Sequence, residues 1–164
     1  MEMADDSERS SDSRDNVHPA FDSTITQSHK VIQVMKEAEL HARSDIPVLI
    51  TGESGTGKDL LAQSIHLSSL RSEFSFTPVN MAALNAGLFE AEFLGHTKGA
   101  FTGSIADREG YLARTDKGTL FMDEIGSTPM EFQGKLLRVL QEGEYYKLGA
   151  SQPKKVNVRF ISAT

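Results

Sequence analysis

The amino-acid sequence predicts an α/β fold in which helices cover both faces of a parallel β-sheet. Short apolar runs that favour strands alternate with segments whose apolar residues recur at helical spacing. Each run is almost continuously apolar, as expected of strands buried on both faces. A glycine-rich segment, residues 52–59, separates the first strand from the helix that follows it. In sheets of this kind, ligands bind beyond the carboxyl ends of the strands, where this segment lies.

Length and composition indicate one domain with a polar extension. The chain has 164 residues and a formal net charge of −6, and this length is enough to bury a sizeable core. Residues 1–19 are rich in Ser, Asp, Glu and Arg. We therefore expect a disordered tail or linker over 1–19 and a folded domain over 20–164.

The composition also excludes several classes of site and partner. There is no cysteine, so disulfides and thiolate metal sites are ruled out. No apolar run approaches the ~20 residues of a membrane span, and the acidic start is unlike a signal peptide. We expect a cytoplasmic protein without membrane contact. Because no basic stripe stands out, DNA would be reached only through a missing segment or a partner.

Taken in order, the first half of the chain predicts alternating helices and strands. Ser28 is the expected cap of the first helix. The predicted elements are a helix over 28–43, a strand over 46–51, a helix over 58–69, a strand over 76–80 and a helix over 84–94. Their helical spacing predicts these buried side chains: Val31, Val34, Met35, Ala38, Ala42, Leu61, Ala62, Ile65, Leu84, Leu88, Ala91 and Phe93.

Beyond residue 94 the pattern is less regular. Residues 95–104 contain three glycines and one aromatic residue without a helical period, and they predict a loop. Thr128 and Glu131 form a capping box, with Pro129 at the first helical position. The helix that it opens is expected to run through Phe132, Leu136, Leu137 and Leu140. This helix is expected to end near 143. The remaining predicted elements are strands over 118–124, 145–148 and 156–163.

The glycine-rich segment has the composition of a phosphate-binding loop. Its glycines let successive main-chain amides point inward and form a nest for anions. The following helix aims its positive N-terminus at the same place, and Lys58 adds a full charge for the β- and γ-phosphates. The alternative is a glycine-rich turn that caps a helix. The residues of this phosphate loop are Gly52, Glu53, Ser54, Gly55, Thr56, Gly57, Lys58 and Asp59. Asp59 stands where a Mg²⁺-binding hydroxyl is usual, and we expect it to act as a favourable acid in the first helical turn.

Two acidic residues and one asparagine follow predicted strands. Asp123 and Glu124 end the strand over 118–124, and strand geometry would send them to opposite sides. One could hold Mg²⁺ through water while the other polarises a water for attack on the γ-phosphate. The alternative is a solvated acidic turn. Asn80 could hydrogen-bond Glu124 and hold it away from that water, or it could simply form a turn.

A second loop has the composition of a contact surface for a partner. An exposed Phe101 beside Thr102, between flexible glycines, would serve as an aromatic anchor on a movable arm. Alternatively, Phe101 folds back onto the domain. This 99–104 loop consists of Gly99, Ala100, Phe101, Thr102, Gly103 and Ser104.

These motifs resemble the central AAA+ ATPase domain of bacterial sigma-54-dependent transcription activators, also called enhancer-binding proteins. The resemblance runs from about Phe21 to the last residue. It rests on Gly-Glu-Ser-Gly-Thr-Gly-Lys at 52–58, Gly-His-x-x-Gly-Ala-Phe-Thr-Gly at 95–103, Gly-Thr-Leu-Phe-x-Asp-Glu-Ile at 118–125 and Gln-x-Lys-Leu-Leu-Arg-Val-Leu-Gln at 133–141.

The resemblance implies a P-loop NTPase fold, a three-layer αβα sandwich, with ATP and Mg²⁺ as ligands. It assigns Lys58 and its loop to the phosphates, Asp123 to Mg²⁺, Glu124 to water activation and Asn80 to switching Glu124. It also implies that the 99–104 loop contacts sigma-54 in the RNA polymerase holoenzyme. Such activators form rings, usually hexamers, whose ATP hydrolysis remodels the closed promoter complex.

The sequence departs from the family pattern at three places. Ser104 stands where the family usually has Ala, and Thr26 occupies a position near the adenine pocket that is often Gly. The chain ends at Thr164, where the sensor segment begins. The resemblance therefore implies truncation before the fifth strand, the helical lid, the arginine fingers and the DNA-binding domain. Since an arginine finger contributes about 10³–10⁵ in rate, we expect this chain to bind ATP but hydrolyse it weakly. The alternative is a non-catalytic nucleotide-binding or interaction module.

Overall fold

The computed structural model describes residues 17–22, 26, 28–85 and 87–164. Most of the predicted tail over 1–19 lies outside this range, and Pro19 at its end begins the first described element. The elements are, in order, η1 (Pro19–Phe21), α1 (His29–Ala42), β1 (Val48–Ile50), α2 (Lys58–Leu67), β2 (Phe76–Asn80), α3 (Phe89–Leu94), β3 (Gly95–His96), β4 (Arg108–Glu109), α4 (Tyr111–Arg114), β5 (Thr119–Asp123), η2 (Ile125–Ser127), α5 (Met130–Glu142), β6 (Glu144–Tyr145), β7 (Lys154–Lys155) and β8 (Arg159–Ala163). Among the described helices, none has both the length and the apolarity to cross a lipid bilayer.

The main sheet has four parallel strands in the order β1-β8-β5-β2. The last strand of the chain, β8, lies between β1 and β5, so the strands that carry the two predicted phosphate-site motifs are second neighbours. The prediction of a parallel sheet is confirmed. At one edge β2 contains Pro78, which has no N–H to donate. At the other edge β1 leaves Leu49 61% exposed.

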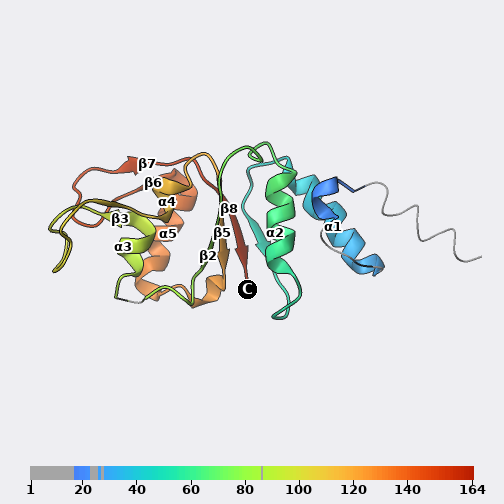
Figure 1. Cartoon of the computed structure of the whole chain (residues 1–164), viewed down its shortest axis with the longest axis horizontal. Helices are drawn as coiled ribbons and strands as arrows, with labels where there is room; N and C mark the ends of the chain where they lie inside the picture. The colour runs from blue at the N-terminus through green and yellow to red at the C-terminus, as the bar shows by residue number, and fades with distance from the viewer. Residues whose placement is uncertain (1–16, 23–25, 27, 86) are drawn as a thin grey trace, which may run out of the picture.

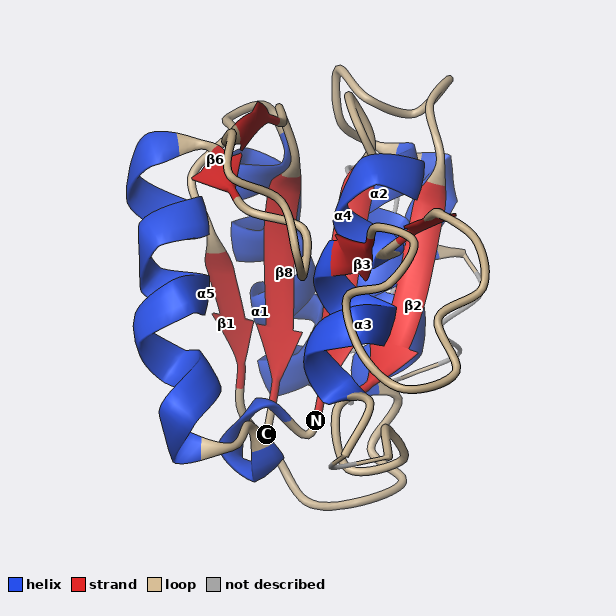
Figure 2. Ribbon diagram, turned by 90° about the vertical axis from the view of Figure 1, so that its left-hand side faces the viewer, coloured by secondary structure: helices blue, strands red, loops and turns tan. Residues whose placement is uncertain are grey.

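Helices cover the two faces of this sheet, which makes three layers. Figure 1 shows α1 and α2 on one side of the strands and α3, α4 and α5 on the other. In Figure 2 the side that carries α3 and α5 faces the viewer, and the strands of the sheet lie behind these helices. Two buried clusters fill the layers. Along β5, Leu120 and Met122 belong to the cluster under α3 and α5, while Phe121 belongs to the cluster under α1 and α2. This alternation explains why β5 is apolar at almost every position.

The helix predicted over 84–94 is shorter in the structure, where α3 begins at Phe89. Side-chain oxygens of two asparagines accept main-chain hydrogen bonds just before it. Asn80 accepts from Ala82 and Ala83, and Asn85 accepts from Gly87. Such local bonds offer the backbone an alternative to helix, so the segment forms turns. Consequently Leu88, predicted to be buried, is 41% exposed.

The start of α5 also differs from the prediction. The Thr128 hydroxyl donates to the Ile125 carbonyl at 2.7 Å instead of capping the helix. Pro129 is the N-cap, and its side chain makes no cap bond. The helix buries Phe132, Leu136 and Val139, whereas Leu137 and Leu140 are exposed. The predicted capping box is therefore wrong, and the buried stripe passes through Val139.

At the end of α2 that points away from the phosphate loop, one histidine is buried. The His66 side chain is 2% exposed, and its Nδ1 lies 2.9 Å from the Thr119 hydroxyl oxygen. Burial lowers the pKa of His66 below its ordinary value of 6.5, because the charged ring would be poorly solvated there. The ring is therefore held neutral in the folded state at neutral pH.

This buried histidine predicts acid sensitivity. The unfolded chain binds the His66 proton first, so the free energy of unfolding should fall as pH drops below about 6.5. We expect His66→Gln to lose less stability than the wild type between pH 7.5 and pH 5.5, measured by urea unfolding at both values. His29→Gln, at an exposed position, is the matched control and should follow the wild type. Equal losses in His66→Gln and the wild type would contradict this assignment.

Candidate functional site

The phosphate loop is a compact turn between β1 and α2. Gly55 and Gly57 adopt φ values of +78° and +81°, in the left-handed region that glycine enters at little cost. Gly57 is also the N-cap of α2. The first amides of α2, which have no partner within the helix, therefore face the curl of the loop.

Lys58 folds back over this loop. Its Nζ donates to the main-chain carbonyls of Gly52 at 2.9 Å and Glu53 at 3.0 Å, and the Thr56 hydroxyl also donates to the Glu53 carbonyl at 2.8 Å. The ammonium group thus lies beside the inward-facing amides. Asp59 lies exposed in the first turn of α2, as predicted.

A hollow of about 320 Å³ opens beside the phosphate loop. It lies between α1, the end of β1 and the start of α2, and its apolar wall includes Val31 and Val34, which are 37% and 46% exposed. We predicted both valines to be buried in the core, which is wrong. In the structure Ile32 takes the buried position on α1 instead. The sequence of α1 already indicated a second apolar surface, because its apolar residues span a wider arc of the helix than one packing face requires.

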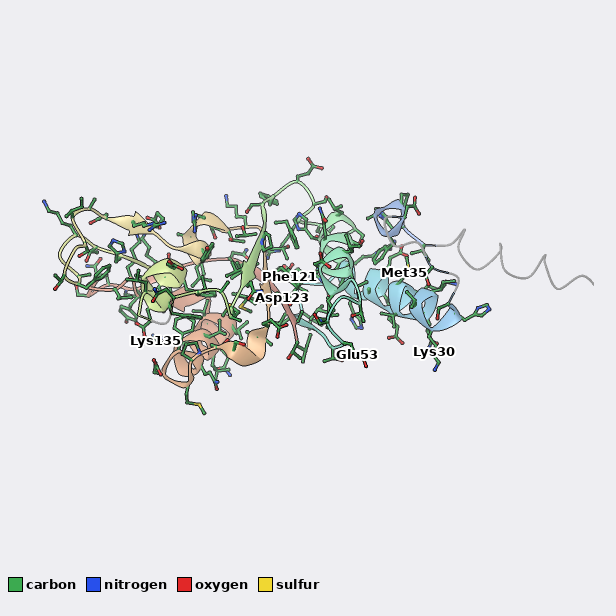
Figure 3. The ribbon with its side chains drawn as sticks, turned by 60° about the horizontal axis from the view of Figure 1, so that its bottom comes forward. Lys30, Met35, Glu53, Phe121, Asp123 and Lys135 are labelled. Carbon is green, nitrogen blue, oxygen red and sulfur yellow. The ribbon has the colours of Figure 1, made fainter. Side chains whose placement is uncertain are left out.

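Asp123 ends β5 level with the start of the phosphate loop. Met122 pairs with Ser162, and Ile50 pairs with Ala163, so Asp123 and Ile50 flank the same point of β8. Two strand spacings separate them, about 10 Å. Strand alternation places the Asp123 side chain on the same face as Phe121, which is the face covered by α2 (Figure 3).

Glu124 does not continue the strand. Its φ is +54°, which is uncommon for a residue other than glycine, and it is the N-cap of η2. We predicted opposite directions for the two carboxylates from strand geometry, but the strand ends at Asp123 and that rule does not apply. Instead the Glu124 amide donates to Asp123 Oδ1 at 3.0 Å. Backbone strain of this kind is concentrated at functional sites.

Asn80 lies beside the acidic pair because its Cα is the register partner of Asp123. Its side-chain oxygen accepts from the amides of Ala82 and Ala83 at 2.9 and 3.2 Å. These bonds use the amide oxygen and form a turn, the alternative that the sequence left open. Within the described part of the chain, the Asn80 side chain makes no hydrogen bond to Glu124.

The 99–104 loop lies apart from these groups, beyond α3 on the opposite face of the sheet (Figure 1). Phe101 is half-buried, and its ring lies edge-on to His96 with ring centroids 4.9 Å apart. Of the two alternatives that the sequence left open for Phe101, the one in which the ring folds back describes the structure. Thr102 and Gly103 are exposed at the tip.

A neighbouring turn supports this loop. Thr97 donates its amide to the Leu148 carbonyl at 3.0 Å, and the Leu148 amide donates to the Gly95 carbonyl at 3.0 Å. Gly149 adopts φ +79°, and a Cβ there would lie 2.6 Å from Thr97 Oγ1 and 2.9 Å from Ala100 Cβ. Sequence reasoning missed this contact, although the glycine in the turn was its one visible signal.

The same region contains a charged connection between the two small hairpins β3–β4 and β6–β7. Glu109 of β4 accepts hydrogen bonds from Lys147 Nζ at 2.6 Å and Lys154 Nζ at 3.0 Å. These two cations hold the pKa of Glu109 below its usual range. The hairpins are thereby tied together beneath the 99–104 loop.

The structure therefore brings the predicted residues together in two places. The phosphate loop, Asp123, Glu124 and Asn80 meet at the carboxyl edge of the sheet, while the 99–104 loop forms a separate surface. The first group combines a glycine-rich turn at the N-terminus of α2 with two carboxylates at the same edge of the sheet.

Comparison with known proteins agrees with this arrangement. The family described as the Sigma-54 interaction domain matches residues 24–164. The chain belongs to this family. The resemblance predicted from its motifs is thus confirmed, and the chain is part of the AAA+ domain found in bacterial enhancer-binding proteins.

Among curated relatives of this sigma-54 interaction domain, the Nif-specific regulatory protein of Rhizobium leguminosarum bv. trifolii is 50% identical over 140 residues. The match covers 85% of this chain and 40% of that protein. Transcriptional regulatory protein GlrR of Escherichia coli is 47% identical over 140 residues, covering 85% of this chain and 32% of that protein. The chain thus spans less than half the length of these relatives.

Solved structures show the same fold. NtrX from Brucella abortus in complex with ATP has a TM-score of 0.78 and 33% sequence identity, over 86% of this chain and 30% of that chain. A P-loop NTPase domain from E. coli, at 16% identity and a TM-score of 0.55 over 85% of this chain, agrees in fold alone. The predicted α/β P-loop NTPase fold is confirmed.

Proposed function

We propose that this sigma-54 interaction domain binds ATP and Mg²⁺, hydrolyses ATP within a ring of subunits, and acts on the sigma-54 RNA polymerase holoenzyme in the bacterial cytoplasm. The observation that carries the proposal is the meeting of the phosphate loop with Asp123 and Glu124 at one edge of the sheet. DNA contact would come only from a domain outside this chain.

Nucleotide binding follows from the residues around the loop. Lys58 and the amides after Gly57 would contact the phosphates, and the hollow walled by Val31 and Val34 would receive the apolar face of the base. Asp123 would be the protein ligand for Mg²⁺, which commonly takes one or two carboxylates together with substrate phosphates. Among the described residues, no group of three or more His, Asp or Glu is arranged to hold a metal ion.

In hydrolysis Glu124 would orient and polarise the attacking water. Asn80 on β2 is the register partner of Asp123, the residue before Glu124. It would engage Glu124 with its side-chain amide nitrogen, because the turn uses only the amide oxygen. In this role Asn80 would hold Glu124 away from the attacking water until a partner contacts the 99–104 loop.

The alternative, a non-catalytic nucleotide-binding module, has one observation in its favour. Among the described residues that line the hollow, Lys30 and Lys58 are the only cationic ones. A cation from a neighbouring subunit would be needed to stabilise the transition state. We therefore propose that the isolated chain hydrolyses ATP slowly.

Two measurements on the purified chain test the proposal. We expect saturable ATP binding with steady-state turnover well below about one per second. We also expect binding to labelled sigma-54 that is lost in Phe101→Ala and kept in Leu40→Ala, a matched control 76% exposed on α1. A turnover of about one per second would contradict slow hydrolysis. Equal binding by both variants would contradict the assigned contact.

A further inference from the structure

Ser104 closes the 99–104 loop with both its side chain and its main chain. The hydroxyl donates to the Phe101 carbonyl at 2.8 Å and accepts from the Phe101 amide at 3.1 Å. The Ser104 amide also donates to the Phe101 carbonyl at 3.0 Å, and the Ser104 carbonyl accepts from the Gly99 amide at 2.8 Å. Ser104 itself is 7% exposed, so these bonds are shielded from water.

Both hydrogen bonds and packing hold this closed form. Gly99 and Gly103 adopt φ values of +80° and +99°, and a Cβ at either position would meet nothing within 4 Å. The glycines are therefore not wedged between neighbouring groups, whereas Ala100 lies against Gly149 and Phe101 lies against His96. Within the loop, the two hydrogen bonds of the Ser104 hydroxyl close the turn that carries Phe101.

The closed form determines where Phe101 lies. It sets the ring against His96, which is itself buried at 9% exposure. Hollows of about 280 and 390 Å³ lie next to Phe101, and Leu88 lines both of them. The ring therefore has room to leave His96 once the loop opens.

We propose that Ser104 is a positioning residue that retains Phe101 against His96, so that the 99–104 loop must open before Phe101 engages sigma-54. The partner named here rests on the proposed function, whereas the retention itself rests on the geometry of the loop. A ligand that binds only the open form loses apparent affinity in proportion to the fraction of closed loops.

Hydrogen exchange and binding together test this role. We expect Ser104→Ala to speed exchange of the Gly99 amide about fivefold, because a hydroxyl hydrogen-bond pair is lost. Gly99 bonds to the Ser104 main chain, so its exchange reports loop opening rather than the deleted hydroxyl. Affinity for sigma-54 should rise by about the same factor. Ser104→Thr retains a hydroxyl and should restore both values toward the wild type.

Ser44→Ala is the matched control, because Ser44 also donates its hydroxyl to the carbonyl three residues earlier, at His41. It should change neither readout. Unchanged Gly99 exchange in Ser104→Ala would overturn the retention, and faster exchange with equal or weaker sigma-54 binding would overturn its gating role. If the wild type and every variant fail to bind sigma-54 while exchange responds as expected, the proposed function fails and the retention stands.

Discussion

Lys58→Ala should weaken ATP binding by about 100-fold. The lysine would contribute a full charge and charge-assisted hydrogen bonds to the phosphates, each worth about 1.5–3 kcal/mol, and two such bonds at the lower end of this range correspond to about this factor. Its Nζ already lies over the loop through the carbonyls of Gly52 and Glu53. Isothermal titration calorimetry with ATP and Mg²⁺ measures the change.

Two further variants sharpen this result. Glu124→Gln should keep ATP binding near the wild-type value, because Glu124 is assigned to the water rather than to the phosphates. Lys36→Ala removes an equal charge from an exposed position on α1 and should also leave binding unchanged. A comparable loss of affinity in Lys36→Ala would mean that net charge, and not the geometry of the loop, attracts the nucleotide.

The second large effect concerns the core beneath α5. Phe132 is 1% exposed and meets Phe89 and Phe93 edge-on, with ring centroids 4.7 and 5.1 Å apart. Phe132→Ala should lower the free energy of unfolding by about 3–5 kcal/mol, from lost transfer energy and the cavity left behind. Urea unfolding followed by circular dichroism measures this loss.

Leu137→Ala on the same helix is the control for this prediction. Leu137 is 52% exposed. We expect a change of less than about 1 kcal/mol. Similar losses in the two variants would show that α5 packs on a different face from the one described.

The main sheet and the phosphate loop could be predicted from the sequence because their signals are local and strong. The bounds of β2 agree to the residue, and the glycine spacing around Lys58 leaves few other structures. The start of α3 could not be predicted, since Asn80 and Asn85 redirect the backbone through side-chain bonds that have no periodic pattern. Two-residue strands such as β3 and β6 are too short to show any period.

At the candidate site, the sequence indicated residues that lie at one edge of the sheet but could not predict their conformations. The left-handed backbone of Glu124, and so the direction of its side chain, depends on the turn into η2. Phe101 likewise depends on a tertiary contact with His96. Composition alone cannot distinguish an aromatic ring at a loop tip from one folded onto a neighbour.

The two edges of the main sheet differ in their capacity for lateral growth. Pro78 interrupts the row of donors along β2, whereas Val48–Ile50 in β1 presents an unbroken row beside the exposed Leu49. An incoming strand would therefore dock against β1 and finish next to Gly52. Sheet extension is directional in this molecule, and whatever segment supplies the extra strand comes to lie beside the phosphate loop.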